Sequence, residues 1–163
     1  MSKTILLAVD TSGEHVTAAV DMVKDLARTD DQVVVLHVHE FAVGRFGRIQ
    51  VDCLEGEGEK LVGDIVASLG RSGIKAEGAI READYGHVAR KIVAVAQDTG
   101  TRMLVLGSSS RTDLPRMPFG SVSGRLLHLA SLPVLIVPMH AAERVPEQAA
   151  APQHEGVAPV VAD

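Results

Sequence analysis

Short, almost continuous apolar runs alternate along this chain with longer segments of helical periodicity, and no other feature restricts the fold as strongly. Runs of roughly four to eight mostly β-branched residues are typical of strands buried on both faces of a parallel sheet. The predicted strands are 4–9, 33–38, 102–106 and 134–137, together with 74–80, whose alternating pattern suits a strand nearer an edge. Apolar residues at helical spacing predict helices within 16–27, 61–69, 88–96 and 122–130.

Five strands separated by four helices predict an α/β fold with a single doubly wound parallel sheet, of the Rossmann-like kind. Ligands of such sheets bind outside the carboxyl ends of the strands, where the winding reverses. We expect this domain to occupy residues 1–138. The composition changes after Pro138, and residues 139–163, which are rich in Ala, Pro and Glu, predict a disordered tail.

The composition excludes several classes of function. Sixteen Lys and Arg against twenty-one Asp and Glu give a net charge of −5 without a basic block, so a general nucleic-acid binder is not expected. Cys53 is the one cysteine, which excludes an intrachain disulfide and suits a reducing compartment. No apolar run approaches the roughly 20 residues of a membrane span, and the N-terminus lacks the pattern of a signal peptide. We therefore expect a cytoplasmic protein.

The segment after the strand 102–106 combines small residues, hydroxyl groups and arginines in a way that suits an anion. Gly107 permits a close approach to the backbone, while Gly120 and Ser121 open the last helix, whose N-terminus attracts negative charge. Hydroxyl and guanidinium groups that could pair with a phosphate belong to Ser108, Ser109, Ser110, Arg111 and Arg116. The alternative is a serine-rich loop that only caps the helix, since helix N-termini favour Ser and Gly without any ligand.

The segment GSSSRTDLPRMPFGSVSGRLLHLASLPVLIVP resembles the closing part of universal stress protein (UspA-type) domains. Nucleotide-binding members of that family carry Gly, two residues, Gly, nine residues, Gly and then Ser or Thr. Gly107 and Gly120-Ser121 match this pattern, whereas Ser110 stands in place of the second glycine. The opening ILLAVDTSGEH also resembles the start of the family's domains, so that the resemblance spans residues 3–138.

The resemblance implies that ATP or a related adenine nucleotide such as AMP binds here, with or without Mg²⁺. Asp10 would face the base and ribose, and Val9 and Val38 would lie against the adenosine. The phosphates and ribose would be held by Gly107, Ser108, Ser110, Arg111, Gly120, Ser121 and Val122. A left-handed backbone at Ser110 would cost about 1 to 2 kcal/mol, which weakens binding without abolishing it.

The resemblance also implies a homodimer, because members of the family commonly pair their last strand, here Val134–Val137, antiparallel with its twin. An exposed apolar edge strand invites such pairing. No residue is assigned a catalytic role, since no general base is positioned beside an attacking water, and we expect at most slow ATP hydrolysis. The leading prediction is a dimeric stress-response sensor or regulator that binds an adenine nucleotide.

Two other functions compete with this prediction. A nucleotide-independent interaction module of the same fold would act through protein–protein contacts, and Ser110, Pro115 and Pro118 favour it. An enzyme on a related fold ranks last. The chain has neither G-x-G-x-x-G after its first strand nor G-x-x-x-x-G-K-[ST], the phosphate-binding patterns of dinucleotide enzymes and P-loop NTPases.

Histidines provide a further pattern. His37 and His39 alternate along the second strand and should point to one face, a spacing that suits a metal ion. No third ligand is evident, and Cys53 is separated from them by an unpatterned loop, so we predict no metal site. We expect His15, His87 and His128 on the surface or at helix ends.

The segment 41–48, FAVGRFGR, is glycine-punctuated and follows the second strand. It could fold over the ligand crevice as a lid that brings Arg45 or Arg48 near a phosphate. It could equally be a mobile loop whose phenylalanines anchor it to the domain, because binding loops and anchored loops share this composition.

Overall fold

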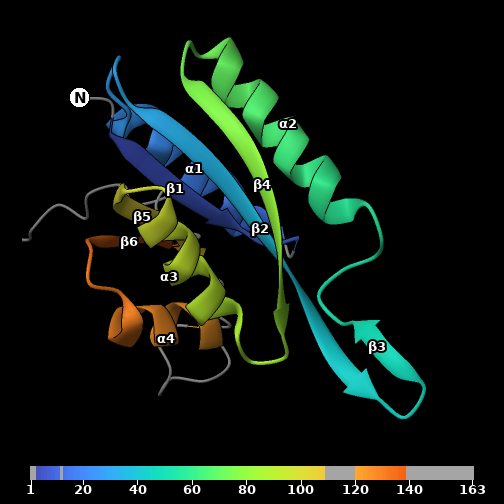
Figure 1. Cartoon of the computed structure of the whole chain (residues 1–163). Coiled ribbons are helices and arrows are strands. Elements are labelled where there is room, and N and C mark those ends of the chain that lie inside the picture. The colour runs from blue at the N-terminus through green and yellow to red at the C-terminus, as the bar shows by residue number, and fades with distance from the viewer. Residues whose placement is uncertain (1–2, 12, 109–119, 139–163) are drawn as a thin grey trace, which may run out of the picture.

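Within the residues that the structure describes, 3–11, 13–108 and 120–138, six strands form one sheet and four helices cover its faces (Figure 1). The protein is represented by a computed structural model. The strands are β1 (Thr4–Val9), β2 (Gln32–Gly44), β3 (Gly47–Gln50), β4 (Lys75–Asp84), β5 (Thr101–Ser108) and β6 (Val134–Pro138). The helices are α1 (Glu14–Leu26), α2 (Glu57–Arg71), α3 (Val88–Asp98) and α4 (Ser121–Leu129).

The parallel part of the sheet has the order β4-β2-β1-β5-β6. The chain winds outward from β1 through β2 to β4, and α3 then returns it to β5 on the other side of β1. The winding therefore reverses between β1 and β5, which confirms the doubly wound fold that the sequence predicts. In such folds the crevice for a ligand lies where these two strands end.

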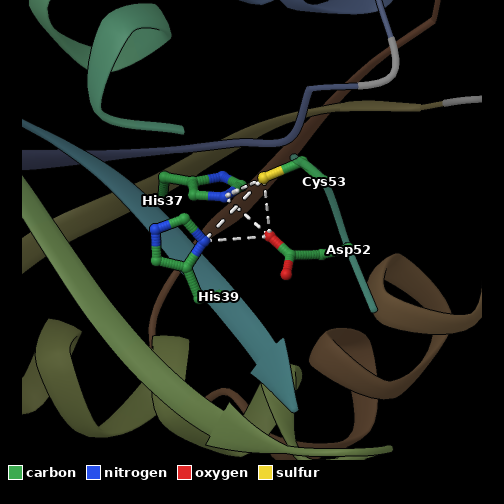
Figure 2. A group of neighbouring side chains, drawn as sticks. All are labelled: His37, His39, Asp52 and Cys53. Atoms are coloured by element: carbon green, nitrogen blue, oxygen red, sulfur yellow. Dashed lines mark hydrogen bonds and ion pairs between the residues drawn. The ribbon is translucent and has the colours of Figure 1, made fainter. Parts of the chain in front are cut away.

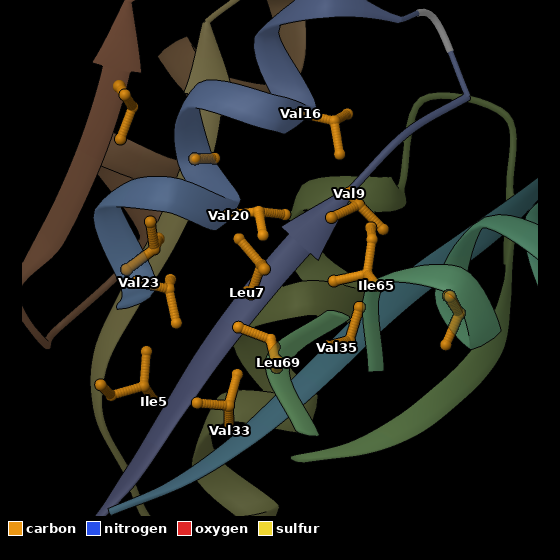
Figure 3. Packing of buried hydrophobic residues seen from close by; sticks show 14 residues of the cluster. Ile5, Leu7, Val9, Val16, Val20, Val23, Val33, Val35, Ile65 and Leu69 are labelled. Carbon is orange, nitrogen blue, oxygen red and sulfur yellow. The ribbon is translucent and has the colours of Figure 1, made fainter. Parts of the chain in front are cut away.

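Two apolar layers hold the helices to the sheet, α1 and α2 on one face and α3 and α4 on the other. Successive side chains of a strand point to opposite faces, so a strand covered on both sides must be apolar throughout. In β1, Ile5 and Leu7 belong to the layer under α1 and α2, shown in Figure 3, whereas Leu6 belongs to the opposite layer. This explains why the central strands read as unbroken apolar runs.

The structure differs from the sequence prediction most clearly after the second strand. The run 33–38 is only part of β2, which continues to Gly44, turns, and returns as the antiparallel strand β3. Gly47 has a φ of 122° at this turn, a backbone conformation that favours glycine. The segment 41–48 is therefore a β-hairpin, which projects beyond the rest of the sheet in Figure 1. The expectations of a lid and of an anchored loop are both wrong.

The hairpin also explains where its arginine points. The guanidinium group of Arg48 lies 3.9 Å from the centre of the Phe41 ring, and its Nη1 pairs with Glu82 of β4 at 2.6 Å. Arg48 is thus bound to the outer sheet rather than directed at a phosphate.

Among the described residues, no helix has the length and apolar character that a membrane crossing requires. The predicted tail 139–163 lies outside the described residues.

Candidate functional site

A cavity of about 300 Å³ opens past the carboxyl ends of β1 and β5, beside the middle of β2, in the crevice expected for this fold. Leu36, Leu106 and Ile92 contribute an apolar wall, while the polar groups around it come from strand ends and from the first turns of helices. The polar lining residues are Asp10, Thr11, His15, His37, Glu40, Asp52, Ser121 and Ser123. An apolar cavity with a few convergent polar groups is the usual form of a small-molecule site.

Most of the residues predicted to bind a nucleotide lie around this cavity. Those that line it are Val9, Asp10, Val38, Gly107, Gly120, Ser121 and Val122. Ser108 is buried at the end of β5 and is not among the lining residues. Ser110 and Arg111 lie outside the described residues, as do Ser109 and Arg116.

Gly107 is needed for packing within the protein itself. A Cβ atom at this position would lie 2.5 Å from the carbonyl oxygen of His15 and 2.7 Å from its ring Cδ2. The close approach that we expected of a ligand is therefore made by the first turn of α1. The sequence indicated that a close approach occurs at Gly107, but not which partner makes it.

The N-terminus of α4 lies at the cavity. Gly120 precedes the helix in an extended conformation, with φ −62° and ψ 168°, and its carbonyl oxygen accepts hydrogen bonds from Gly124 N–H at 2.9 Å and Ser123 Oγ at 3.2 Å. The first N–H groups of an α-helix have no acceptor inside the helix, and the helix dipole makes this end positive. This side of the cavity can therefore receive an anion through backbone groups.

Asp10, which follows β1, pairs with His15 in the first turn of α1. His15 Nε2 lies 2.9 Å from Asp10 Oδ1, with 56% of the Asp10 side chain exposed and 6% of that of His15. The expectation that His15 lies at a helix end is met, but a surface position is wrong, because α1 packs this residue against Gly107. Asp10 remains open enough to accept a hydrogen bond from a ligand hydroxyl.

His37, His39, Asp52 and Cys53 form a compact polar cluster (Figure 2), and two of them, His37 and Asp52, line the cavity. The two imidazole rings lie edge to face with 4.8 Å between their centres, on the same face of the strand as their alternation predicts. Asp52 Oδ2 lies 3.0 Å from His37 Nε2, 3.1 Å from His39 Nδ1 and 3.1 Å from Cys53 Sγ. One nitrogen, oxygen or sulfur atom from each of the four residues lies within 4.8 Å of all the others.

Asp52 was not predicted, and Cys53 was considered but set aside as a ligand, because the hairpin was not predicted. β2 and β3 pair Phe41 with Gln50, and beyond this pair Val51 N–H donates to the Glu40 carbonyl oxygen at 2.8 Å. The returning chain therefore places Asp52 beside His39, past the end of β1. The local signal for the hairpin is the pair of glycines, Gly44 and Gly47, that flank its two-residue turn. This signal is weak, because the turn lacks the Asn-Gly or Asp-Gly pair that marks most such hairpins.

The cluster changes the protonation of its members. Burial raises the pKa of Asp52, but hydrogen bonds from the Cys53 thiol, the Glu40 N–H and His39 outweigh burial and lower the pKa to about 2. Burial lowers the pKa of His39, but hydrogen bonds to Glu59 and Asp52 outweigh it and raise the pKa above its ordinary value. Burial and the neighbouring Asp52 raise the pKa of Cys53. The cluster therefore holds a firmly ionised carboxylate beside a thiol that keeps its proton.

Solved structures with the same fold come from several organisms. The hypothetical protein MJ0577 is 25% identical, with 85% of this chain and 96% of that chain covered at a TM-score of 0.61. A universal stress protein from Archaeoglobus fulgidus in complex with dAMP is 19% identical, with coverage of 83% and 97% and a TM-score of 0.62. A universal stress protein family protein from Arabidopsis thaliana with AMP bound is 17% identical, with coverage of 89% and 97% and a TM-score of 0.60.

The family comparison agrees with the fold. No curated protein matches the sequence. The model of the universal stress protein family matches residues 1–138, which is the whole of the described domain and most of the chain. The chain therefore belongs to the universal stress protein family.

Proposed function

We propose that this protein binds an adenine nucleotide in the cavity past the ends of β1 and β5, beside the middle of β2. The observation that supports this most strongly is that one cavity joins an apolar wall to the N-terminus of α4. Val9 and Val38 would lie against the adenine ring, and Asp10 would accept a hydrogen bond from a ribose hydroxyl. The phosphates would lie at Gly120 and Ser121, where backbone N–H groups attract anions.

Two further facts favour this ligand. Solved members of the fold from Archaeoglobus fulgidus and Arabidopsis thaliana hold dAMP and AMP. In addition, the chain between β5 and α4 contains Ser110, Arg111 and Arg116, whose hydroxyl and guanidinium groups suit a phosphate chain. We therefore favour ATP, with or without Mg²⁺, over AMP. We assign no catalytic residue and expect at most slow hydrolysis of ATP.

A second candidate function is a nucleotide-independent interaction module. It is favoured by the contact between Gly107 and the first turn of α1, which accounts for this glycine without a ligand. The pairing of Asp10 with His15 likewise gives that carboxylate a role within the protein. The two functions differ in whether the domain has measurable affinity for nucleotide.

Calorimetric titration of the full chain with ATP and AMP, each with and without Mg²⁺, tests the proposal. We expect one nucleotide per chain, and Gly120→Leu should weaken binding at least tenfold, which corresponds to about 1.4 kcal/mol. The backbone angles of Gly120 suit any residue, so this substitution should leave the fold intact. Gly63→Leu on the exposed face of α2, where a Cβ meets nothing within 4 Å, is the matched control. Absence of binding at millimolar nucleotide with Mg²⁺ would reject the proposal in favour of the interaction module.

We also propose that the protein acts as a dimeric sensor or regulator in a stress response, through its edge strand β6. Among the described residues, β6 pairs only with β5. Leu104 N–H donates to the Pro133 carbonyl oxygen, so that the backbone groups of Val134 and Ile136 face away from β5. Ile136→Pro removes an outward N–H group and should convert a dimer to a monomer in sedimentation equilibrium. A wild-type chain that sediments as a monomer at all concentrations would contradict the dimer.

A further inference from the structure

We propose that His37, His39, Asp52 and Cys53 form a four-coordinate binding site for a Zn²⁺ ion. Two of these residues, His37 and Asp52, line the cavity, but none of the four is a proposed nucleotide contact, and the proposal does not depend on nucleotide binding. Two imidazole nitrogens, a carboxylate oxygen and a thiolate are the donor types that Zn²⁺ takes in proteins, and four of them fill a tetrahedral site. The same four atoms are close together here because β2 and the chain after β3 meet beyond the end of β1.

Both ring nitrogens of His37 lie next to an oxygen that can accept a hydrogen bond. His37 Nδ1 lies 2.9 Å from the carbonyl oxygen of Val9, which can only accept, so Nδ1 carries a proton. In a neutral imidazole the other nitrogen, Nε2, then has a lone pair, and it lies 3.0 Å from Asp52 Oδ2. A lone pair and a carboxylate oxygen at this distance require a proton or a metal cation between them.

His39 repeats this arrangement. Its Nε2–H donates a hydrogen bond to Glu59 Oε1 at 3.0 Å. Its other nitrogen, Nδ1, lies 3.1 Å from Asp52 Oδ2. The amide Nε2 of Gln50 lies 2.9 Å from the same Nδ1, which identifies Nδ1 as the nitrogen with the lone pair. On metal binding, Gln50 would give up this contact and keep its hydrogen bond to the Cys53 carbonyl oxygen.

A metal ion satisfies the contacts of both histidines with Asp52, and it leaves less net positive charge in the cluster than two added protons do. Without a metal, the contacts of both rings with Asp52 would be hydrogen bonds only if two imidazolium rings lay 4.8 Å apart, with only 2% of His37 and 6% of His39 exposed, and the proton on His39 Nδ1 would displace the hydrogen bond from Gln50. Burial of two like charges so close together is unfavourable. With Zn²⁺ bound, both rings stay neutral, and their outer N–H groups remain bonded to the Val9 carbonyl and to Glu59. Such outer partners are typical of histidine ligands of metals.

The remaining two ligands are also held in place. Asp52 Oδ1 accepts the Glu40 N–H at 3.0 Å, which leaves Oδ2 to bind the metal. Cys53 Sγ lies 3.8 Å from His37 Nε2 and 3.8 Å from His39 Nδ1. Ligand atoms of a tetrahedral zinc site lie roughly 3.3 to 3.6 Å apart, given bonds of about 2.0 to 2.3 Å. Five of the six separations are 3.0 to 3.8 Å, and the sixth, between the two imidazole nitrogens, lies within 4.8 Å, so metal binding would draw the two rings closer together.

The backbone of α2 lies directly against the two histidine rings at Gly58. A Cβ atom on Gly58, at the start of α2, would collide with the ring of His37 and lie 2.8 Å from His39 Cε1. Four protein ligands would leave no coordination position for water or substrate, which is the pattern of a structural zinc ion. The ion would join the chain between β3 and α2 to β2. When it binds, the Cys53 thiol loses its proton to solvent and coordinates as a thiolate.

Titration of the metal-free full chain with Co²⁺ and Zn²⁺, in the absence of nucleotide, tests this proposal. We expect one Co²⁺ per chain with the intense visible bands of tetrahedral coordination and a near-ultraviolet thiolate charge-transfer band, and displacement of Co²⁺ by Zn²⁺. Bound Zn²⁺ should also slow the alkylation of Cys53. Because the titration contains no nucleotide, its outcome is independent of the nucleotide proposal.

Variants identify the ligands. Cys53→Ala should remove the charge-transfer band, and Cys53→Ala and His39→Gln should each weaken Zn²⁺ binding by on the order of 100-fold. His128→Gln, which changes an exposed histidine of α4, is the control and should bind as the wild type does. The spectrum of wild-type protein needs no variant to fold. An octahedral Co²⁺ spectrum without a thiolate band, or equal Zn²⁺ affinity of the wild type and Cys53→Ala, would overturn the proposal.

Discussion

The two polar sides of the cavity are built from different parts of the chain. On the side of β2, side chains from β2 and from the chain after β3 form a cluster whose members bond to one another. On the side of β5 and α4, the groups that face the cavity are mainly backbone groups, and glycines stand at the critical positions 107 and 120. The proposed metal site depends on the identity of side chains on the first side, and the proposed nucleotide site on the absence of side chains on the second.

This difference determines which substitutions each side tolerates. The β2 side should be sensitive to the loss of single functional groups, because each group has two or more partners there. The β5 side should be sensitive to added atoms, because helix α1 packs directly on β5 at Gly107. Three measurements test this contrast, and they are taken in order of the expected effect.

Asp52→Ala should have the largest effect on stability. The substitution leaves the Glu40 N–H, the Cys53 thiol and two buried imidazole nitrogens without their shared acceptor, and we expect a loss of about 3 kcal/mol in the free energy of unfolding. Urea unfolding with a chelator present measures the protein alone. Glu77→Ala, which removes an exposed carboxylate of β4, should change stability by less than about 0.5 kcal/mol. Equal effects of the two substitutions would contradict the distinct role of the cluster.

Gly107→Ala should cost about 2 kcal/mol, because the added methyl group meets the backbone of α1 and cannot be relieved by rotation of a side chain. Gly124→Ala provides the control within α4. A Cβ at position 124 meets nothing within 4 Å, so this variant should gain about 1 kcal/mol from the better helix propensity of alanine. Thermal unfolding of both variants measures the difference, and a neutral Gly107→Ala would show that the first turn of α1 can move away from β5.

The two sides should also differ in their response to pH. The pKa of Asp52 is lowered to about 2, so its contribution to stability is present above its ordinary value of about 3.9 and is lost as the pH falls toward 2. The pKa of His39 is raised above 6.5 by Glu59 and Asp52 against the effect of burial, so its contribution is present below 6.5 and is lost as the pH rises through the raised pKa.

The stability difference between the wild type and Asp52→Ala, measured with a chelator, should therefore be greatest between about pH 4 and 6.5 and should decrease on both sides. The variation of this stability difference with pH should be smaller than the loss of stability that Asp52→Ala itself causes. The difference between the wild type and Gly107→Ala should stay constant with pH, because it reflects packing. Parallel pH profiles for the two variants would mean that the cluster does not titrate as described.

The elements differ in how far the sequence predicts them. β1 and β5 are apolar throughout because both of their faces are covered, and their positions agree with prediction to within one or two residues. β2 exceeds its predicted length because His39 and Glu40 end the apolar run, while the strand continues beyond the covered part of the sheet, where Val43 is exposed. The hairpin was missed for the same reason, and with it the contact of Asp52 and Cys53 with the histidines.

The sequence by itself determined the doubly wound fold and the position of the crevice, because burial on two faces imposes an apolar pattern that is local along the chain. Most of the residues around the crevice followed from the resemblance to universal stress proteins. The sequence also determined that His37 and His39 share a face, since that follows from the geometry of one strand. Only the tertiary structure decided that Gly107 receives helix α1 and that Asp52 and Cys53 complete the histidine pair. These contacts join segments distant along the chain, and they depend on a strand register that no local pattern specifies.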